Sequence, residues 1–213
     1  VRLAIASDDA ARLRGYADEL HETDLAALIE ALDPEERTAL IRLLADSFDF
    51  TALTELDETL RVQILEALPA KTVAEGVLEL ESDDAVALLE DLEPAEQAEI
   101  LAELPPVERA AVARSLTYPE ESAGRLMQTE FIAVPPFWNV GRTIDYMRED
   151  DDLPDEFYVL LVVDASHHLV GTVALDRLLR SKRPTMIDAI ADKDIETVKA
   201  SDDQEDVARV FER

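Results

Sequence analysis

The chain has 213 residues, 47% of them hydrophobic, which suffices for one large or two ordinary folded domains. It contains no cysteine, and this excludes disulfides, thiolate metal sites and cysteine nucleophiles. The 49 acidic and 20 basic residues give a net charge of −29, which repels nucleic acid and anionic membranes, so we expect no nucleic-acid partner. No apolar stretch approaches the roughly 20 residues of a membrane span, and we expect this stretch of chain to be soluble.

Short amphipathic helical patterns, separated by prolines, fill the first 116 residues. Residues 24–36 (DLAALIEALDPEE) match residues 84–96 (DAVALLEDLEPAE), and Pro34 falls on Pro94. Each unit predicts a helix of about three turns, with a proline in the first turn of the next helix. Such helices are unstable alone, so we predict a superhelical array in which the leucine stripes form the core.

Acidic residues in this region occur in runs without any base. Between Thr72 and Glu108 there are twelve Asp or Glu and no Lys or Arg, and between Leu43 and Leu60 there are five acids and no base. A solvated acidic surface, as in a salt-adapted protein, explains such runs. The alternative is that divalent cations complete the charge balance, because hard cations prefer oxygen ligands.

After Pro119 the hydrophobic period changes to that of a small α/β module, followed by the start of a second one. Because the second module begins without the strands that should follow it, we expect the chain to be a fragment of a longer protein. The predicted elements are a strand at 131–135, a helix at 140–150, strands at 157–165 and 169–175, a helix from Asp176, a new round at 185–192, a strand at 196–200 and a helix at 203–213.

The second half resembles a CBS domain in FIAVPPFWNV, YVLLVVDASHHLVG and TVALDRLL, and the last 29 residues resemble the first half of a second CBS domain. Together with the acidic helical repeats and YPEESAGRLM (118–127), the whole chain resembles the cytosolic part of the MgtE family of magnesium transporters. We therefore predict a mainly α superhelical array of short helices followed by an α/β CBS domain. The expected boundaries are 1–117 for the helical domain, 118–184 for the first CBS domain and 185–213 for a truncated second one.

The resemblance implies a function as a cytosolic Mg2+-sensing regulatory region at the cytoplasmic face of the cell membrane. In the family, Mg2+ binds between the acidic helical and CBS domains, screens their repulsion and favours a compact state that holds the pore shut. It also implies two partners, a transmembrane pore domain on the same polypeptide and a second copy joined through the CBS domains. Residues 1–116 carry 28 acids and 9 bases, net −19, and residues 117–213 carry 21 acids and 11 bases, net −10, so two like-charged parts need counter-ions to dock.

The letters ELESDDA supply four candidate ligands, Glu79, Glu81, Asp83 and Asp84. Glu79 and Asp83 are four residues apart and share a face if the helix is continuous. The alternative is that Ser82 caps a new helix, with the two aspartates favouring its positive end. The family resemblance favours Glu79 and Asp83 as interdomain Mg2+ ligands.

The segment YPEESAGRLM is interpreted as a joint between the two halves. Pro119 disfavours helix in the residue before it and so ends the helical array. Ser122 can cap the short turn that follows. Gly124 allows a close approach of the backbone, so its carbonyl is a further candidate ion ligand.

A second acidic group, SDDQED, lies near the end of the chain and offers Asp203 and Glu205 as ligands. The alternative is again helix capping, by Ser201 or Asp202.

CBS domains often bind adenine nucleotides, and the usual pattern closes with Gly, a hydroxyl residue three positions on and Asp three further on. Here Gly171 is followed by Ala174 at the hydroxyl position and by Arg177 at the acid position, with Asp176 one residue early. The pattern is incomplete, so the cofactor-binding residues are unknown and ATP is a weaker prediction than Mg2+.

Catalysis is not expected. The three histidines, His21, His167 and His168, form no recognisable constellation, and no nucleophile-elbow, phosphate-loop or zinc-protease motif occurs. Ser122 near Gly124 lacks the preceding strand of a nucleophile turn. The alternative function is a soluble CBS-containing adaptor that binds a protein partner or an adenine nucleotide.

Overall fold

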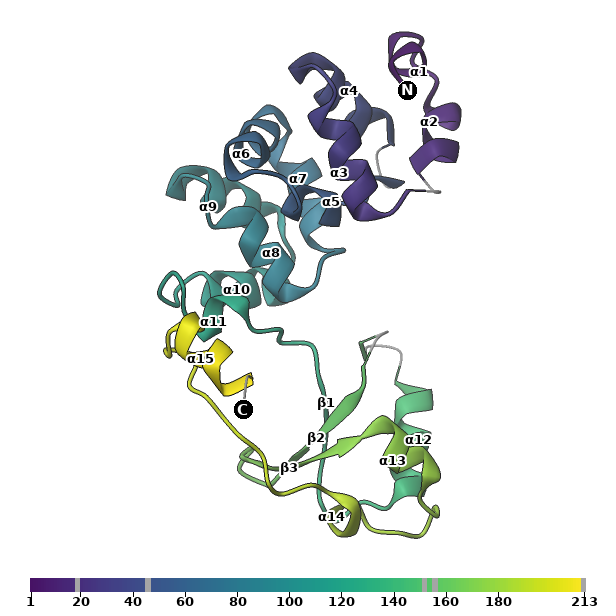
Figure 1. Ribbon diagram of the computed structural model, residues 1–213, viewed down its shortest axis with the longest axis vertical. Coiled ribbons are helices and arrows are strands. Elements are labelled where there is room, and N and C mark those ends of the chain that lie inside the picture. Colours follow the sequence, from purple (N-terminus) through teal and green to yellow (C-terminus); the bar gives the residue numbers. More distant parts are fainter. Residues whose placement is uncertain (18–19, 45–46, 151–152, 155–156, 212–213) are drawn as a thin grey trace. The chain divides into compact units, whose positions relative to one another are not determined.

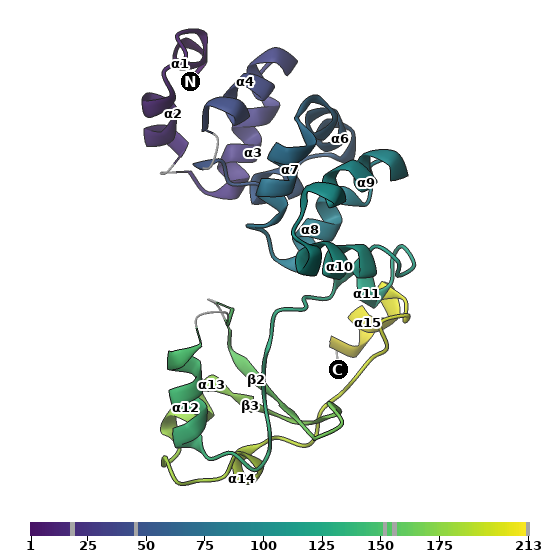
Figure 2. The same cartoon turned by 180° about the vertical axis from the view of Figure 1, so that it is seen from behind.

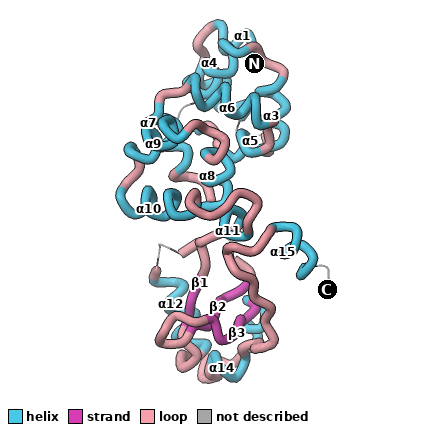
Figure 3. The backbone as a smooth tube through the Cα atoms, turned by 90° about the vertical axis from the view of Figure 1, so that its left-hand side faces the viewer, coloured by secondary structure: helices cyan, strands magenta, loops and turns pink. Residues whose placement is uncertain are grey.

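The computed structural model describes residues 1–17, 20–44, 47–150, 153–154 and 157–211. Its contacts divide the chain into two compact units. We call Val1–Met127 with Ala200–Gln204 the helical unit, and Gln128–Lys199 with Glu205–Arg213 the α/β unit. In Figure 3 the strands of the described chain all fall in the α/β unit.

Short helices stacked one after another build the helical unit, as the purple-to-teal part of Figure 1 shows. Each helix packs against helices one to three positions away in the chain, and a continuous hydrophobic core runs along the array. This arrangement confirms the predicted superhelical array. The helices are α1 (Arg2–Ala6), α2 (Ala10–Ala17), α3 (Glu22–Glu30), α4 (Pro34–Leu44), α5 (Thr51–Thr54), α6 (Glu58–Ala67), α7 (Ala70–Val77), α8 (Ser82–Leu89), α9 (Pro94–Glu103), α10 (Pro106–Ser115) and α11 (Ala123–Leu126).

The internal repeat corresponds to two copies of one helix–turn–helix unit. Pro34 and Pro94 are the first residues of α4 and α9, where a proline loses no hydrogen bond. Leu32 and Leu92, two residues earlier, are each only 4% exposed. In both copies a glutamate of the first turn accepts a hydrogen bond from the backbone N–H before the proline, at 3.1 Å and 3.2 Å. The leucine stripes are therefore core, as predicted.

A small sheet with helices on one face forms the α/β unit. The strand order is β1-β2-β3, with β1 parallel and β3 antiparallel to the central β2. Figures 1 and 2 show α12 and α13 on the same side of this sheet, and Val140, Leu178 and Ile187 from the helices are buried against it. The elements are β1 (Ile132–Val134), α12 (Val140–Glu149), β2 (Val159–Val163), β3 (Leu169–Ala174), α13 (Leu175–Arg180), α14 (Ile187–Ile190) and α15 (Gln204–Phe211).

The strand predicted at 196–200 is absent, and the structure gives residues 193–199 no regular element. A strand needs a neighbouring strand to take its backbone hydrogen bonds. Here the pairing is limited to isolated bridges, Thr172 with Asp192 and Ser122 with Asp203, on either side of the predicted strand. The β propensity of this segment therefore has no ladder to join in this chain.

Candidate functional site

The joint segment packs onto the end of the helical unit around Gly124. This glycine is buried in α11, and a Cβ atom added to it would lie 2.5 Å from the ring of Tyr118. Ser122 stands at the N-cap position of α11 but does not cap it, because its Oγ donates to the carbonyl of Pro119 at 2.6 Å. The joint is thus a compact turn in which the glycine is required for packing.

A segment from much later in the chain pairs with this turn. The backbone N–H of Gly124 donates to the carbonyl of Ala200 at 2.7 Å, and that of Ala123 donates to the carbonyl of Asp202 at 2.8 Å. Ser122 and Asp203 face each other in an antiparallel bridge. Two of the predicted ligand positions, Gly124 and Asp203, are therefore brought together within the helical unit.

Glu205 follows this pairing in the sequence and lies in the first turn of α15. Its carboxylate is 3.5 Å from the guanidinium of Arg209, which also pairs with Asp206. Because α15 begins at Gln204, the residue directly before the helix is Asp203. The predicted caps, Asp202 and Ser201, lie one and two residues further from it.

Two partly buried ion pairs beside the joint were not anticipated from the sequence. Arg125 donates from Nε to the carbonyl of Tyr118 at 2.9 Å, and its Nη1 lies 3.6 Å from Glu90. The Nη2 atom of Arg61 donates a hydrogen bond to the Oδ2 atom of Asp91. Burial raises the pKa of the Glu90 carboxyl above its ordinary 4.5, although the Arg125 guanidinium acts in the opposite direction. The acidic run of the helical unit thus receives part of its positive charge from arginines distant in sequence.

The remaining predicted ligands surround the start of α8. Helix α7 ends at Val77 and α8 begins at Ser82, so the condition for Glu79 and Asp83 to share one helix face is not met, and a new helix begins as the alternative predicted. Glu79 is exposed in the turn between the helices. Glu81, not Ser82, takes the N-cap position, and its side chain makes no capping hydrogen bond.

Asp83 and Asp84 lie in the first turn of α8 in a strongly negative environment. Burial raises the pKa of the Asp84 carboxyl above its ordinary 3.8, and the charges of Asp83, Glu81, Glu22 and Glu55 raise it further. The Oδ1 atom of Asp83 is buried and has no hydrogen-bond partner in the described chain. Sequence reasoning missed Glu22 and Glu55 because they are distant in the sequence, Glu22 in α3 and Glu55 directly after α5.

These carboxylates do not form a preformed cage. Within the described residues, no three His, Asp or Glu side chains converge closely enough to hold a metal ion.

The glycine of the nucleotide pattern, Gly171, has a packing explanation in the structure. A Cβ atom at Gly171 would lie 2.8 Å from the carbonyl oxygen of Asp192, so this glycine permits the bridge between Thr172 and Asp192. Asp176 is exposed in the first turn of α13.

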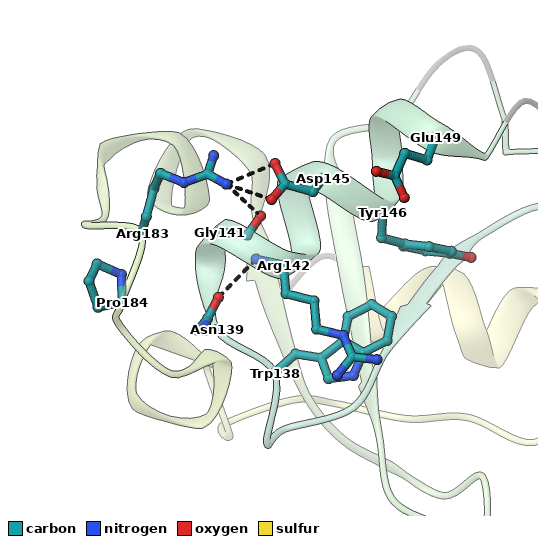
Figure 4. Close-up of a pocket in the computed structure, with 9 residues that line it drawn as sticks. All are labelled: Trp138, Asn139, Gly141, Arg142, Asp145, Tyr146, Glu149, Arg183 and Pro184. Carbon is teal, nitrogen blue, oxygen red and sulfur yellow. Dashed lines mark hydrogen bonds and ion pairs between the residues drawn. The ribbon is translucent and has the colours of Figure 1, made fainter.

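An open hollow of about 640 Å³ lies on the helical side of the α/β unit (Figure 4). Arg183 crosses it and binds both carboxylate oxygens of Asp145, at 2.6 Å and 2.8 Å. Arg142 stacks over the ring of Trp138, with 4.4 Å between the guanidinium carbon and the ring centroid. The Arg183–Asp145 pair satisfies its own charges, so we assign this hollow a structural role.

Comparison with known proteins agrees with this architecture. Residues 20–121 match the MgtE intracellular N domain and residues 123–183 match the CBS domain. No helix in the described ranges is both long and apolar enough to cross a bilayer.

Two curated relatives are magnesium transporters named MgtE. The protein from Thermus thermophilus is 29% identical over 211 residues, which is 98% of this chain and 47% of that protein. The protein from Bacillus subtilis is 22% identical over 200 residues, which is 94% of this chain and 44% of that protein. The chain thus spans less than half the length of these relatives.

A solved structure of the cytosolic domain of the Mg2+ channel MgtE in complex with ATP superimposes with a TM-score of 0.89 and 28% identity, over 99% of this chain and 86% of that one. The similarity therefore extends over both units rather than one shared domain. This chain is an MgtE N domain followed by a CBS domain, homologous to the MgtE magnesium transporters.

Proposed function

We propose that this chain is the cytosolic Mg2+-sensing regulatory region of a magnesium transporter. Mg2+ would bind among the carboxylates of the helical and CBS domains and favour a compact state. Homology to transporters supports the general assignment, and the sensing step is our own inference. The expected domain boundaries remain 1–117, 118–184 and 185–213.

The observation that carries this proposal is the environment of Asp84. Burial raises the pKa of its carboxyl, and the charges of four nearby carboxylates raise it further, so part of the cost of the ionised form is repulsion. A divalent cation near Asp83 and Asp84 would relieve that repulsion, and the relief is the free energy that couples ion binding to a change of state. Glu79, Glu81, Gly124, Asp203 and Glu205 stay proposed contributors.

The same proposal defines partners and location. The pore would be a transmembrane domain on the same polypeptide, and the regulatory region would lie at the cytoplasmic face of the membrane. Full-length relatives are transporters, which supports a regulatory rather than an enzymatic role. We also propose that two copies associate through their CBS domains.

The test is a comparison of compactness with and without Mg2+. Small-angle scattering and limited proteolysis of the 213-residue chain should show a more compact, more resistant form in millimolar Mg2+ than in Na+ of equal ionic strength. Equal compactness and equal cleavage in the two salts would contradict the sensing function.

A matched pair of variants identifies the carboxylates responsible. The variant Asp83→Asn with Asp84→Asn should lose much of the Mg2+ response. The control, Glu103→Gln with Glu108→Gln, removes the same charge from exposed positions of α9 and α10. This control should retain the Mg2+ response. Equal loss in both would assign the effect to net charge rather than to this site.

ATP is a second candidate ligand, because the structural neighbour was solved in complex with it. Calorimetric titration of the chain with ATP, with and without Mg2+, tests this directly. Binding without any Mg2+-dependent compaction would favour the alternative function, an adaptor that binds an adenine nucleotide.

A further inference from the structure

A short basic stretch stands out in this acidic chain. Residues 177–183 contain four cations and no acid, in a protein whose net charge is −29. Arg183 is used by Asp145, whereas Arg177, Arg180 and Lys182 pair with no carboxylate in the described parts of the chain. We call these three residues the basic edge.

The residues of the basic edge are exposed to solvent. Leu178 is fully buried and fixes α13 against the sheet, so Arg177 and Arg180 lie on the exposed part of this short helix. Lys182 follows in the exposed loop. Leu179, between the two arginines, leaves 63% of its surface exposed. The result is a surface that combines three unneutralised cations with one protruding apolar side chain.

Several cations of the helical unit bind partners within that unit, although the exposed Arg14 and Arg114 have none in the described chain. Arg61 and Arg125 pair with carboxylates, and Arg37 and Arg109 donate to backbone carbonyls of their own unit. What distinguishes the basic edge is that its three unpaired cations lie close together in the sequence, amid an excess of acid, which suggests an anionic partner outside the chain.

We propose that the basic edge binds the anionic headgroups of a phospholipid surface, with Leu179 entering the interfacial layer. Basic side chains attract anionic lipid at short range, and an apolar side chain among them adds buried area. The proposal rests on the proposed function, because a regulatory region of a transporter works beside a bilayer.

Two other anionic partners fit the observations less well. A nucleic acid would neutralise the cations but leave Leu179 without an apolar partner. The acidic helical unit of a second copy is complementary in charge, but a surface crowded with carboxylates gives the exposed Leu179 no apolar layer to enter.

The whole-chain charge does not forbid binding to a membrane. At about 0.1 M salt the Debye length is about 10 Å, so a lipid surface senses mainly the charges nearest to it. Residues 175–184 (LDRLLRSKRP) carry four bases and one acid. The net-charge argument from the sequence is therefore valid for the chain as a whole but not for this edge.

Vesicle sedimentation tests the proposal with the full 213-residue chain. Vesicles of phosphatidylcholine alone are compared with an equimolar mixture of phosphatidylcholine and phosphatidylglycerol, in EDTA so that no Mg2+ bridges carboxylates to phosphates. We expect binding to the anionic vesicles only, weakening as salt is raised. Charge reversal by Arg177→Glu, Arg180→Glu and Lys182→Glu should weaken binding by at least about tenfold.

A control variant keeps the change in net charge equal. Arg14→Glu, Lys71→Glu and Arg114→Glu reverse three exposed cations of the helical unit and should leave vesicle binding intact. Leu179→Ser should weaken binding while leaving its salt dependence unchanged. Circular dichroism establishes that each variant is folded.

Three results would overturn the proposal: no binding to anionic vesicles, equal loss in the two triple variants, or self-association without lipid that only the basic-edge variant abolishes. The last would assign the edge to a second copy. Because the assay contains no Mg2+, its outcome is independent of the compaction test, and either hypothesis can fail alone.

Discussion

Gly124 lies so close to the ring of Tyr118 that no residue larger than glycine fits at position 124. A Cβ atom at Gly124 would lie 2.5 Å from the Tyr118 ring, well inside contact distance. The ring is held at the start of the joint, so the clash cannot be relieved by rotation of a long flexible side chain. This contact explains the glycine by packing, independently of any ion.

Gly124→Ala should therefore destabilise the helical unit, by about 1–3 kcal/mol, the usual cost of overpacking. Urea unfolding followed by circular dichroism measures the change. Gly15→Ala is the control, because a Cβ at Gly15 in α2 meets nothing within 4 Å. That substitution should stabilise by about 0.5–1 kcal/mol through helix propensity.

Removal of one partner of the Arg125–Glu90 pair should be costly. Arg125 is largely buried, and Arg125→Met would leave Glu90 without its counter-charge in a partly buried place. We expect a loss of about 2 kcal/mol, less than for a fully buried pair. Unfolding of the single variants and of Arg125→Met with Glu90→Gln gives the coupling energy. A coupling near zero would show that the two side chains act independently.

The sequence predicted the elements that depend on local signals. Two local signals are visible without any tertiary information, and both were confirmed: the prolines at the start of α4 and α9, and the leucines at helical spacing. The strand–helix–strand–strand order of the α/β unit was also predicted, because β1 to β3 are continuous apolar runs.

Features that depend on distant residues were not predicted. Arg125 and Glu90 are far apart in the chain, and only the fold shows that the joint packs on α8. The strand at 196–200 was wrong because strand formation depends on an available partner, which propensity does not reveal. The sequence leaves open whether Glu79 and Asp83 share one helix, because ELESDDA contains no glycine or proline to show the break between α7 and α8.

Asp84→Asn should stabilise the chain at neutral pH in the absence of Mg2+. The substitution removes one charge from a group in which all neighbours are acidic. Because Asp84 is only partly buried and solvent screens its charge, the gain should be about 0.5 kcal/mol. Thermal unfolding in EDTA measures it, and no gain would mean that solvent already screens these charges.

The pH dependence of the same residue has a definite sign. The folded-state pKa of Asp84 is raised above 3.8, so the folded state binds the proton more tightly than the unfolded state. The contribution of Asp84 to stability should thus increase as pH falls through the raised pKa toward 3.8, and it should be smallest at neutral pH. The difference between wild type and Asp84→Asn in stability should accordingly shrink on acidification.

The pairing of Ser122 with Asp203 predicts that two cysteines introduced at these positions would form a disulfide. The backbone hydrogen bonds run from Ala123 to Asp202 and from Gln204 to Glu121, which makes Ser122 and Asp203 a non-hydrogen-bonded antiparallel pair. The Cα atoms of such pairs are about 4.5 Å apart, within the range that a disulfide spans. The chain contains no other cysteine, so the cross-link would be unambiguous.

Ser122→Cys with Asp203→Cys should therefore oxidise readily, with faster migration on a non-reducing gel and loss of free thiol. Ser122→Cys with Ser201→Cys is the control, because it displaces one thiol by two residues from the bridge and should cross-link slowly. Equal cross-linking in both would indicate that residues 200–204 sample many positions. A fast reaction only in the first pair would establish that this segment is held in register on the joint, which is the condition for Gly124 and Asp203 to act on the same ion.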